Sequence, residues 1–151
     1  MGREEIAKTG FRVGREEDAD AIARIESLSF KTPWSKDMIL SEMREPLAHF
    51  FVALKREEVI GYYGFLHITD ELHILNVAVD PDCRGMGVGT ALMAHLLEEG
   101  RRLAARAITL EVRESNQSAI RLYERAGFVL AGVRPHYYTD KENALIYWLE
   151  L

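Results

Sequence analysis

The chain has 151 residues, of which 48% are apolar and 28% charged, and its 19 basic and 24 acidic side chains give a net charge of −5. This length suits one globular domain whose core needs no disulfide or metal. The single cysteine, Cys83, excludes an internal disulfide and a cysteine-based zinc site. The acidic balance argues against general nucleic-acid binding and favours a basic partner.

The hydropathy pattern excludes two further classes of protein. No window approaches the roughly 18 consecutive apolar residues of a membrane span. Residues 1–10 are charged and lack the apolar core of a signal peptide. We therefore expect a cytoplasmic protein without a membrane partner. It has a polar leader at 1–10, whose order the sequence leaves open, and a single domain at 11–151.

Charge is distributed unevenly along the chain. Residues 1–75 hold 14 acids and 10 bases, whereas residues 76–151 hold 10 acids and 9 bases. Between Arg84 and Arg134, eight arginines accompany five glutamates. An anion would suit the second half and a cation the first, although two solvated faces of different composition would also explain these counts.

The first half of the chain begins with helical patterns and continues with strand patterns. The expected elements are a strand at 11–13, helices at 16–28 and 35–45, and strands at 49–54, 59–68 and 72–79. Ser35 is the predicted N-cap of the second helix, which must stop before Pro46. The first helix should bury Ala21, Ile22, Ile25 and Leu28. Hairpin-length connections predict an antiparallel meander of the last three strands.

A glycine-rich turn introduces a different pattern in the second half. We expect a helix at 88–104, a strand at 107–112, a helix capped by Ser115 or Asn116 and ended by Gly127, and strands at 128–133 and 145–151. The first of these helices links two parallel strands by a right-handed crossover. The predicted fold is an α/β sandwich with a mixed sheet of about seven strands and four helices.

The turn has the sequence Cys83-Arg84-Gly85-Met86-Gly87-Val88-Gly89-Thr90. Its place between a strand and a helix is where backbone N–H groups and the helix dipole can bind an anion. It lacks the Gly-Lys-Ser/Thr ending of a Walker loop and the glycine spacing of a Rossmann fingerprint. What remains is Arg84-x-x-Gly87-x-Gly89, which suits a pyrophosphate, although glycines are also ordinary in such turns.

This loop, placed after Val77-Ala78-Val79-Asp80-Pro81, resembles the acetyl-coenzyme A loop of the Gcn5-related N-acetyltransferase (GNAT) superfamily. Residues 110–123 and Gly127-Phe128 are similar to its RimI branch, the ribosomal-protein-alanine N-acetyltransferases, as are residues 33–35 and 137–138. The resemblance extends from about residue 11 to the C-terminus. It implies the GNAT fold, a mixed central sheet with helices packed on both faces, and acetyl-CoA as cosubstrate without a metal.

The resemblance also implies roles for individual residues. Glu111 would be the general base toward the amine, directly or through water, and Tyr123 the general acid toward the leaving thiolate. A backbone N–H at residues 77–79 would stabilise the oxyanion. An isolated strand-end glutamate is usually a solvated carboxylate, and packing alone would explain an inward tyrosine. The implied cofactor-binding residues are Val77, Ala78, Val79, Arg84, Gly85, Met86, Gly87, Val88, Gly89 and Asn116.

The implied acceptor is the N-terminal alanine of a small-subunit ribosomal protein with a basic tail. Trp34, Tyr137 and Tyr138 would line its groove. The acidic first half of the chain would suit a cationic peptide, with Glu42, Glu45, Asp70 and Glu71 as the first candidates. Cys83 is expected to be an unreactive surface thiol, because no motif places a histidine beside it.

Two other functions compete with this interpretation. The acceptor could instead be a different protein N-terminus, a lysine side chain or a small amine such as a polyamine. A non-catalytic acetyl-CoA-binding subunit is a second alternative, but such a protein should have lost the glutamate, the tyrosine or the loop glycines. All of these are present in the chain.

Overall fold

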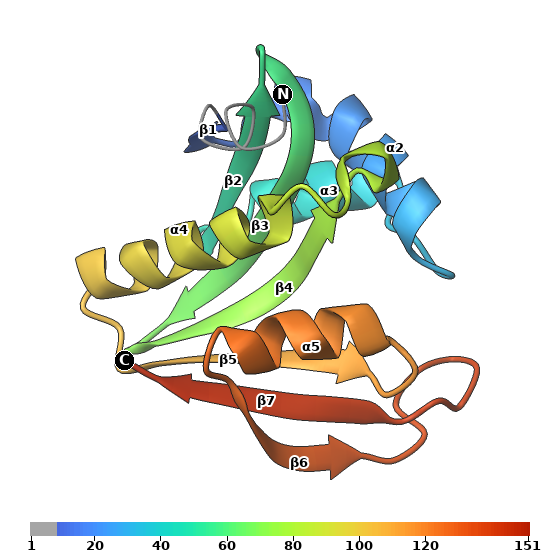
Figure 1. Ribbon diagram of the computed structural model, residues 1–151, viewed down its shortest axis with the longest axis vertical. Coiled ribbons are helices and arrows are strands. Elements are labelled where there is room, and N and C mark those ends of the chain that lie inside the picture. Colours follow the sequence, from blue (N-terminus) through green and yellow to red (C-terminus); the bar gives the residue numbers. More distant parts are fainter. Residues whose placement is uncertain (1–8) are drawn as a thin grey trace.

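The computed structural model describes residues 9–151, which form a seven-stranded mixed sheet with four α-helices (Figure 1). The strand order is β1-β2-β3-β4-β5-β7-β6. The strands are β1 (Gly10–Val13), β2 (Ala48–Lys55), β3 (Glu58–Ile68), β4 (Glu71–Val79), β5 (Ala107–Arg113), β6 (Val129–Arg134) and β7 (Ala144–Glu150). The helices are α2 (Ala19–Ser29), α3 (Lys36–Met43), α4 (Val88–Arg102) and α5 (Gln117–Arg125), with 3-10 turns η1 (Glu16–Asp18) and η2 (Pro81–Cys83). This architecture confirms the predicted fold class.

The connections between strands also follow the prediction. Strands β1 to β4 form an antiparallel meander, and α4 carries the chain from β4 to a parallel β5. Strand β7 then inserts between β5 and β6 and pairs antiparallel with both. The Ser35 hydroxyl accepts a hydrogen bond from Met38 N, so this residue caps α3 as expected.

Strands β4 and β5 pair over only part of their length. Their register begins at Glu71 opposite Ala107 and ends at His73 opposite Thr109. A register shift between β3 and β4, at Gly64/Phe65, lies just beyond this point. A bulge bends the strand that carries it. The two strands therefore diverge, and Figure 1 shows the resulting V between them.

Two cores cover the two faces of the sheet. Alternate residues of a strand point to opposite faces, so Phe50 and Tyr62 pack under α2 and α3, while Phe51 and Tyr63 pack under α4 and α5. Figure 1 shows α4 and α5 together on the near face. The V between β4 and β5 therefore has α4 and α5 on one face of the sheet and α2 and α3 on the other.

The first helix differs from its prediction in two ways. The predicted helix starts instead as the 3-10 turn η1. The buried Asp18 carboxylate accepts hydrogen bonds from the Arg12 side chain and from Arg15 N, and these bonds fix the turn. Leu28 was predicted to be buried but is 55% exposed. The inward face contains Glu26, which is 1% exposed. The buried face of α2 therefore includes Glu26 and excludes Leu28, which the pattern of apolar residues did not predict.

Two sequence expectations concern the leader and the membrane. Most of the leader, residues 1–8, lies outside the described residues. Among residues 9–151, no helix combines the length and apolar character needed to cross a bilayer.

Candidate active site

Two cavities lie on either side of the V between β4 and β5. One has a volume of about 420 Å³ and is lined by the glycine-rich turn, β4 and α5. The other has a volume of about 550 Å³ and is lined by β4, β5 and the segments before α3 and β7. They share five lining residues: Phe30, Val77, Asn116, Ala119 and Tyr123. Molecules bound in the two cavities would therefore meet at the divergence of the strands.

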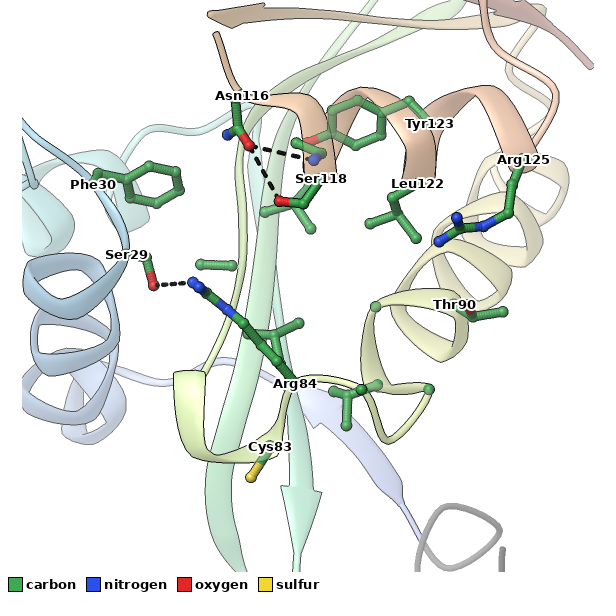
Figure 2. A pocket seen from close by; sticks show the side chains of 18 residues that line it. Ser29, Phe30, Cys83, Arg84, Thr90, Asn116, Ser118, Leu122, Tyr123 and Arg125 are labelled. Atoms are coloured by element: carbon green, nitrogen blue, oxygen red, sulfur yellow. Dashed lines mark hydrogen bonds between the residues drawn. The ribbon is translucent and has the colours of Figure 1, made fainter. Parts of the chain in front are cut away.

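The glycine-rich turn forms one wall of the smaller cavity. Gly85 and Gly87 have φ angles of 79° and 81°, in the left-handed region that favours glycine. Gly87 is the N-cap of α4, so the first N–H groups of that helix border the cavity. Figure 2 shows the Arg84 side chain extending across the cavity toward α2, where Nη2 donates to Ser29 Oγ at 3.2 Å. This wall combines a permanent cation with backbone donors, which suits a pyrophosphate.

Asp80 fixes the start of that turn. Its carboxylate accepts hydrogen bonds from Arg24 Nη2 at 2.7 Å and from Asp82 N at 2.9 Å. Burial by itself would raise the pKa of Asp80, but the hydrogen bonds from Arg24 and Asp82 N–H outweigh it and hold the pKa below its ordinary value. The group is thus a buried anion that ties η2 to α2.

Nine of the ten residues predicted to bind the cofactor line the smaller cavity, namely Val77, Ala78, Val79, Arg84, Gly85, Gly87, Val88, Gly89 and Asn116. Met86 does not, because its side chain packs against the core cluster of Ala53 and Ile60. Sequence reasoning missed Ser29, Phe30, Thr90, Ser118, Leu122 and Arg125. The spacing of Ser118, Leu122 and Arg125 on one face of α5 could have indicated three of them.

The edge of β4 beyond His73 is open toward β5. On its other side, Val77 pairs with Tyr63 and Ala78 with Tyr62 of β3. Because pairing with β5 has already ended, backbone groups on the open side are available to an extended ligand arm. This open stretch includes Val77, Ala78 and Val79, which the family resemblance implies as cofactor-binding residues.

Asn116 lies at the junction of the two cavities. Its Oδ1 accepts a hydrogen bond from Ala119 N at 3.3 Å, so the side chain caps α5. The same residue lines both cavities. Asn116 therefore caps α5 and also lies where the predicted contact with the cofactor would be made.

Tyr123 also lies at the junction and is 6% exposed. Its ring packs on Phe128, with 5.9 Å between ring centroids. Burial raises the pKa of Tyr123 well above its ordinary value. Burial therefore disfavours the phenolate, and the neutral hydroxyl is available as a hydrogen-bond donor at the junction.

Glu111 lines the larger cavity from β5. It lies two positions past Thr109, the last residue of β5 that pairs with β4. Arg134 Nε, on β6, is 3.4 Å from Glu111 Oε2. The Glu111 charge in turn raises the pKa of the Tyr137 hydroxyl. The carboxylate thus faces the cavity with a cation and a phenol beside it.

Aromatic residues line the larger cavity, and they include Trp34, Tyr137 and Tyr138, the residues expected in the acceptor groove. The Arg113 guanidinium lies 4.1 Å from the centroid of the Tyr138 ring and forms ion pairs with Asp140 and Glu142. Burial raises the pKa of Tyr138 to about 12. These contacts hold the segment between β6 and β7 against the end of β5.

The acidic residues first considered for a peptide groove are not part of either cavity. Asp70 and Glu71 lie at the closed end of the V, where both pair with Arg106. Glu42 and Glu45, at the end of α3 and after it, line neither cavity. Their place in a longer peptide groove stays a prediction. The carboxylates that line the larger cavity are those of Glu26 and Glu111.

Cys83 lines the smaller cavity at its lower edge, with the sulfur pointing away from its centre in Figure 2. Burial raises the pKa of the Cys83 thiol, which disfavours the nucleophilic thiolate. Over residues 9–151, no three His, Cys, Asp or Glu side chains are grouped so that they could hold a metal ion.

Comparison with known proteins agrees with this geometry. Residues 19–128 match the family model described as the acetyltransferase (GNAT) family. A Bacillus subtilis protein provisionally named as a [ribosomal protein bS18]-alanine N-acetyltransferase is 39% identical over 146 residues, covering 95% of this chain and 97% of that protein. The Escherichia coli K12 protein named [ribosomal protein bS18]-alanine N-acetyltransferase is 36% identical over 133 residues. The match covers 85% of this chain and 88% of that protein.

The fold is also similar to solved structures. The crystal structure of the ribosomal-protein-S18-alanine N-acetyltransferase from Escherichia coli superposes with a TM-score of 0.87 and 32% sequence identity. The superposition covers 94% of this chain and 93% of that one. The two chains therefore share the fold over nearly their whole lengths.

Proposed function

Because the chain belongs to the acetyltransferase (GNAT) family, whose acetyl donor is acetyl-CoA, we propose that it acetylates the N-terminal α-amine of a small-subunit ribosomal protein. The target residue is an alanine, and the amine attacks the thioester directly in a ternary complex. The observation that carries the proposal is the junction of two cavities at Tyr123, with Glu111 on the acceptor side. The acceptor is proposed from two relatives whose names specify acetylation of alanine in ribosomal protein bS18.

The donor side is built from backbone groups and one cation. Acetyl-CoA supplies the activated acetyl thioester. The first turn of α4 and Arg84 bind its pyrophosphate, where Gly85 and Gly87 leave no Cβ in the way. The open edge of β4 at Val77–Val79 pairs with the pantetheine arm. A backbone N–H of this edge stabilises the oxyanion during transfer.

Proton movements are assigned to two side chains. Glu111, directly or through water, takes the proton that the acceptor nitrogen must lose, either from the ammonium before the neutral amine attacks or from the amine as its bond to carbon forms. The nitrogen forms its bond to the acetyl carbon, and the carbon–sulfur bond breaks with its electron pair going to sulfur. Tyr123 donates its phenolic proton to that thiolate or, at the least, a hydrogen bond. Because burial raises the pKa of Tyr123, the hydrogen bond is the smaller demand on this side chain.

An N-terminal amine suits a carboxylate base. Its pKa is about 7.7–8.0, compared with about 10.4 for a lysine side chain, so a substantial fraction is neutral near pH 7.5. The enclosed acceptor cavity, bordered by Trp34, Tyr137 and Tyr138, suits the end of a chain. A basic tail beyond the first residues would suit the net charge of −5. A ribosomal acceptor implies that the reaction takes place in the cytoplasm.

A comparison of acceptors tests this proposal. Initial rates are measured with a peptide that begins Ala-Arg, with its Nα-blocked analogue containing lysine, and with a polyamine. We expect kcat/KM to be highest for the free N-terminus. Preference for the blocked lysine peptide or the polyamine would refute the proposed acceptor, and no transfer to any of the three would favour a non-catalytic binding protein.

A further inference from the structure

Glu26 is the most deeply buried charged side chain among residues 9–151, at 1% exposed. The other two buried carboxylates, Asp18 and Asp80, each pair with an arginine. The hydrogen bonds to Glu26 come from neutral donors: Tyr62 Oη at 2.5 Å, Asn76 Nδ2 at 3.0 Å and Trp34 N at 2.9 Å. Burying a carboxylate without a cation is unfavourable, and an apolar residue at this position of α2 would satisfy the core.

The three donors come from three segments that shape the acceptor cavity. Tyr62 belongs to β3, Asn76 to β4 and Trp34 to the connection between α2 and α3. Glu26, Trp34 and Asn76 all line that cavity. The carboxylate therefore joins the segment that carries Trp34, between α2 and α3, to strands β3 and β4.

Asn76 also marks the place where β4 bends. It pairs with Gly64, directly after the register shift, and precedes Val77, which lines both cavities. A Cβ on Gly64 would lie 2.5 Å from the Phe50 ring, so this stretch of β3 is closely packed and has little freedom to shift. A hydrogen bond from Asn76 to a fixed carboxylate thus holds the bent part of β4 at a set distance from α2.

We propose that Glu26 is a positioning residue for acetyl transfer, which aligns the acceptor with Glu111 by fixing Trp34 and the bend of β4. Because its carboxylate is occupied by hydrogen bonds and only 1% of the residue is exposed at the cavity wall, it acts through Trp34 and Asn76. Loss of the carboxylate frees the acceptor wall while the glycine-rich turn, 3-10 turn η2 and Arg84 keep their own contacts. The defect is therefore confined to the acceptor side. The inference rests on the proposed function only for the identity of that acceptor.

The test compares Glu26→Gln with Asp18→Asn, which removes another buried carboxylate whose contacts lie outside both cavities. Circular dichroism first establishes the folded fraction. For Glu26→Gln we expect the KM of the Ala-Arg peptide to rise about ten-fold, as for loss of a charged hydrogen bond, with the KM of acetyl-CoA unchanged. Asp18→Asn should lower kcat only in proportion to the folded fraction. Tyr62→Phe, which deletes one donor and keeps the ring, should raise the peptide KM about three-fold.

A second measurement needs no acceptor. In a Trp148→Phe background, Trp34 provides the fluorescence, and Glu26→Gln should shift its emission to longer wavelength because the segment gains contact with water. Wild-type peptide KM in both Glu26→Gln and Tyr62→Phe, with unchanged Trp34 emission, would overturn the inference. A wild-type enzyme that leaves the peptide unacetylated would instead refute the proposed function, and Trp34 emission would then decide the role of Glu26.

Discussion

Arg134 Nε lies 3.4 Å from Glu111 Oε2, so the carboxylate on β5 is paired with a cation from β6, two strands away in the sheet. The same guanidinium lies 5.9 Å from the centroid of the Tyr137 ring. The pairing turns Glu111 toward the aromatic residues that border the acceptor cavity. The orientation of the proposed base therefore depends on β7 lying between β5 and β6.

Replacing Glu111 with Gln removes the proposed base and keeps the side chain's size. We expect kcat to fall about 10²- to 10⁴-fold at neutral pH, the usual contribution of a general base. The KM of acetyl-CoA should change little, because Glu111 does not line the donor cavity. Steady-state kinetics with each substrate varied in turn measures both effects. Turnover equal to wild type would remove Glu111 from the base role.

Replacing Tyr123 with Phe keeps the ring that packs on Phe128 and removes only the hydroxyl. We expect kcat to fall about ten-fold to a hundred-fold, less than for Glu111, because a thiolate is a good leaving group and water can replace the acid in part. The thermal midpoint should stay close to wild type. Kinetics and thermal unfolding of the same preparation check the two statements, and an undiminished kcat would reduce Tyr123 to a packing role.

Replacing Arg84 with Ala tests the pyrophosphate site. The KM of acetyl-CoA should rise about ten-fold or more, since a hydrogen bond to a charged group contributes about 1.5–3 kcal/mol. The KM of the acceptor peptide should be unaffected. Arg101→Ala, at the exposed far end of α4, is the matched control. Equal effects of the two variants on acetyl-CoA binding would contradict the site.

The ion pair between the buried Asp80 and the half-exposed Arg24 predicts a pH-dependent stability. The pKa of Asp80 is lower in the folded chain than in the unfolded chain, so its contribution is present above the unfolded value of about 3.9 and is lost as pH falls through the folded value. Asp80→Asn should lower the free energy of unfolding by about 1–3 kcal/mol at pH 7. Urea denaturation from pH 7 to pH 3 should show the two proteins converging in acid; a difference that persists unchanged at pH 3 would argue against the ion pair.

Local patterns were sufficient to predict most elements of the fold. Alternation and short turns gave the meander up to Val79, and helical spacing gave the crossover α4 and the capped α5. The position of β7 between β5 and β6 was not predictable, because pairing of distant strands is decided by packing. The splay of β4 from β5 has no local signal either, since it follows from a register shift against β3.

The site was predicted unevenly for similar reasons. The glycine-rich turn carries its chemistry in a contiguous stretch, so Arg84, Gly85 and Gly87 could be identified from the sequence. Glu26 could not, because a single acid within an apolar helix face looks like an exposed residue until its three donors are seen. The acids suggested for the peptide groove were chosen by charge alone, and Asp70 and Glu71 prove to pair with Arg106 at the closed end of the V.

Mass spectrometry of a purified small-subunit ribosomal protein that begins with alanine and has a basic tail can identify both the acceptor and the acetylated atom. After incubation with acetyl-CoA and the enzyme, the account predicts one added acetyl group, located by fragmentation on the N-terminal alanine. The addition should be absent with Glu111→Gln over the same period. Acetylation on lysine side chains, or no mass change with the wild-type enzyme, would contradict it.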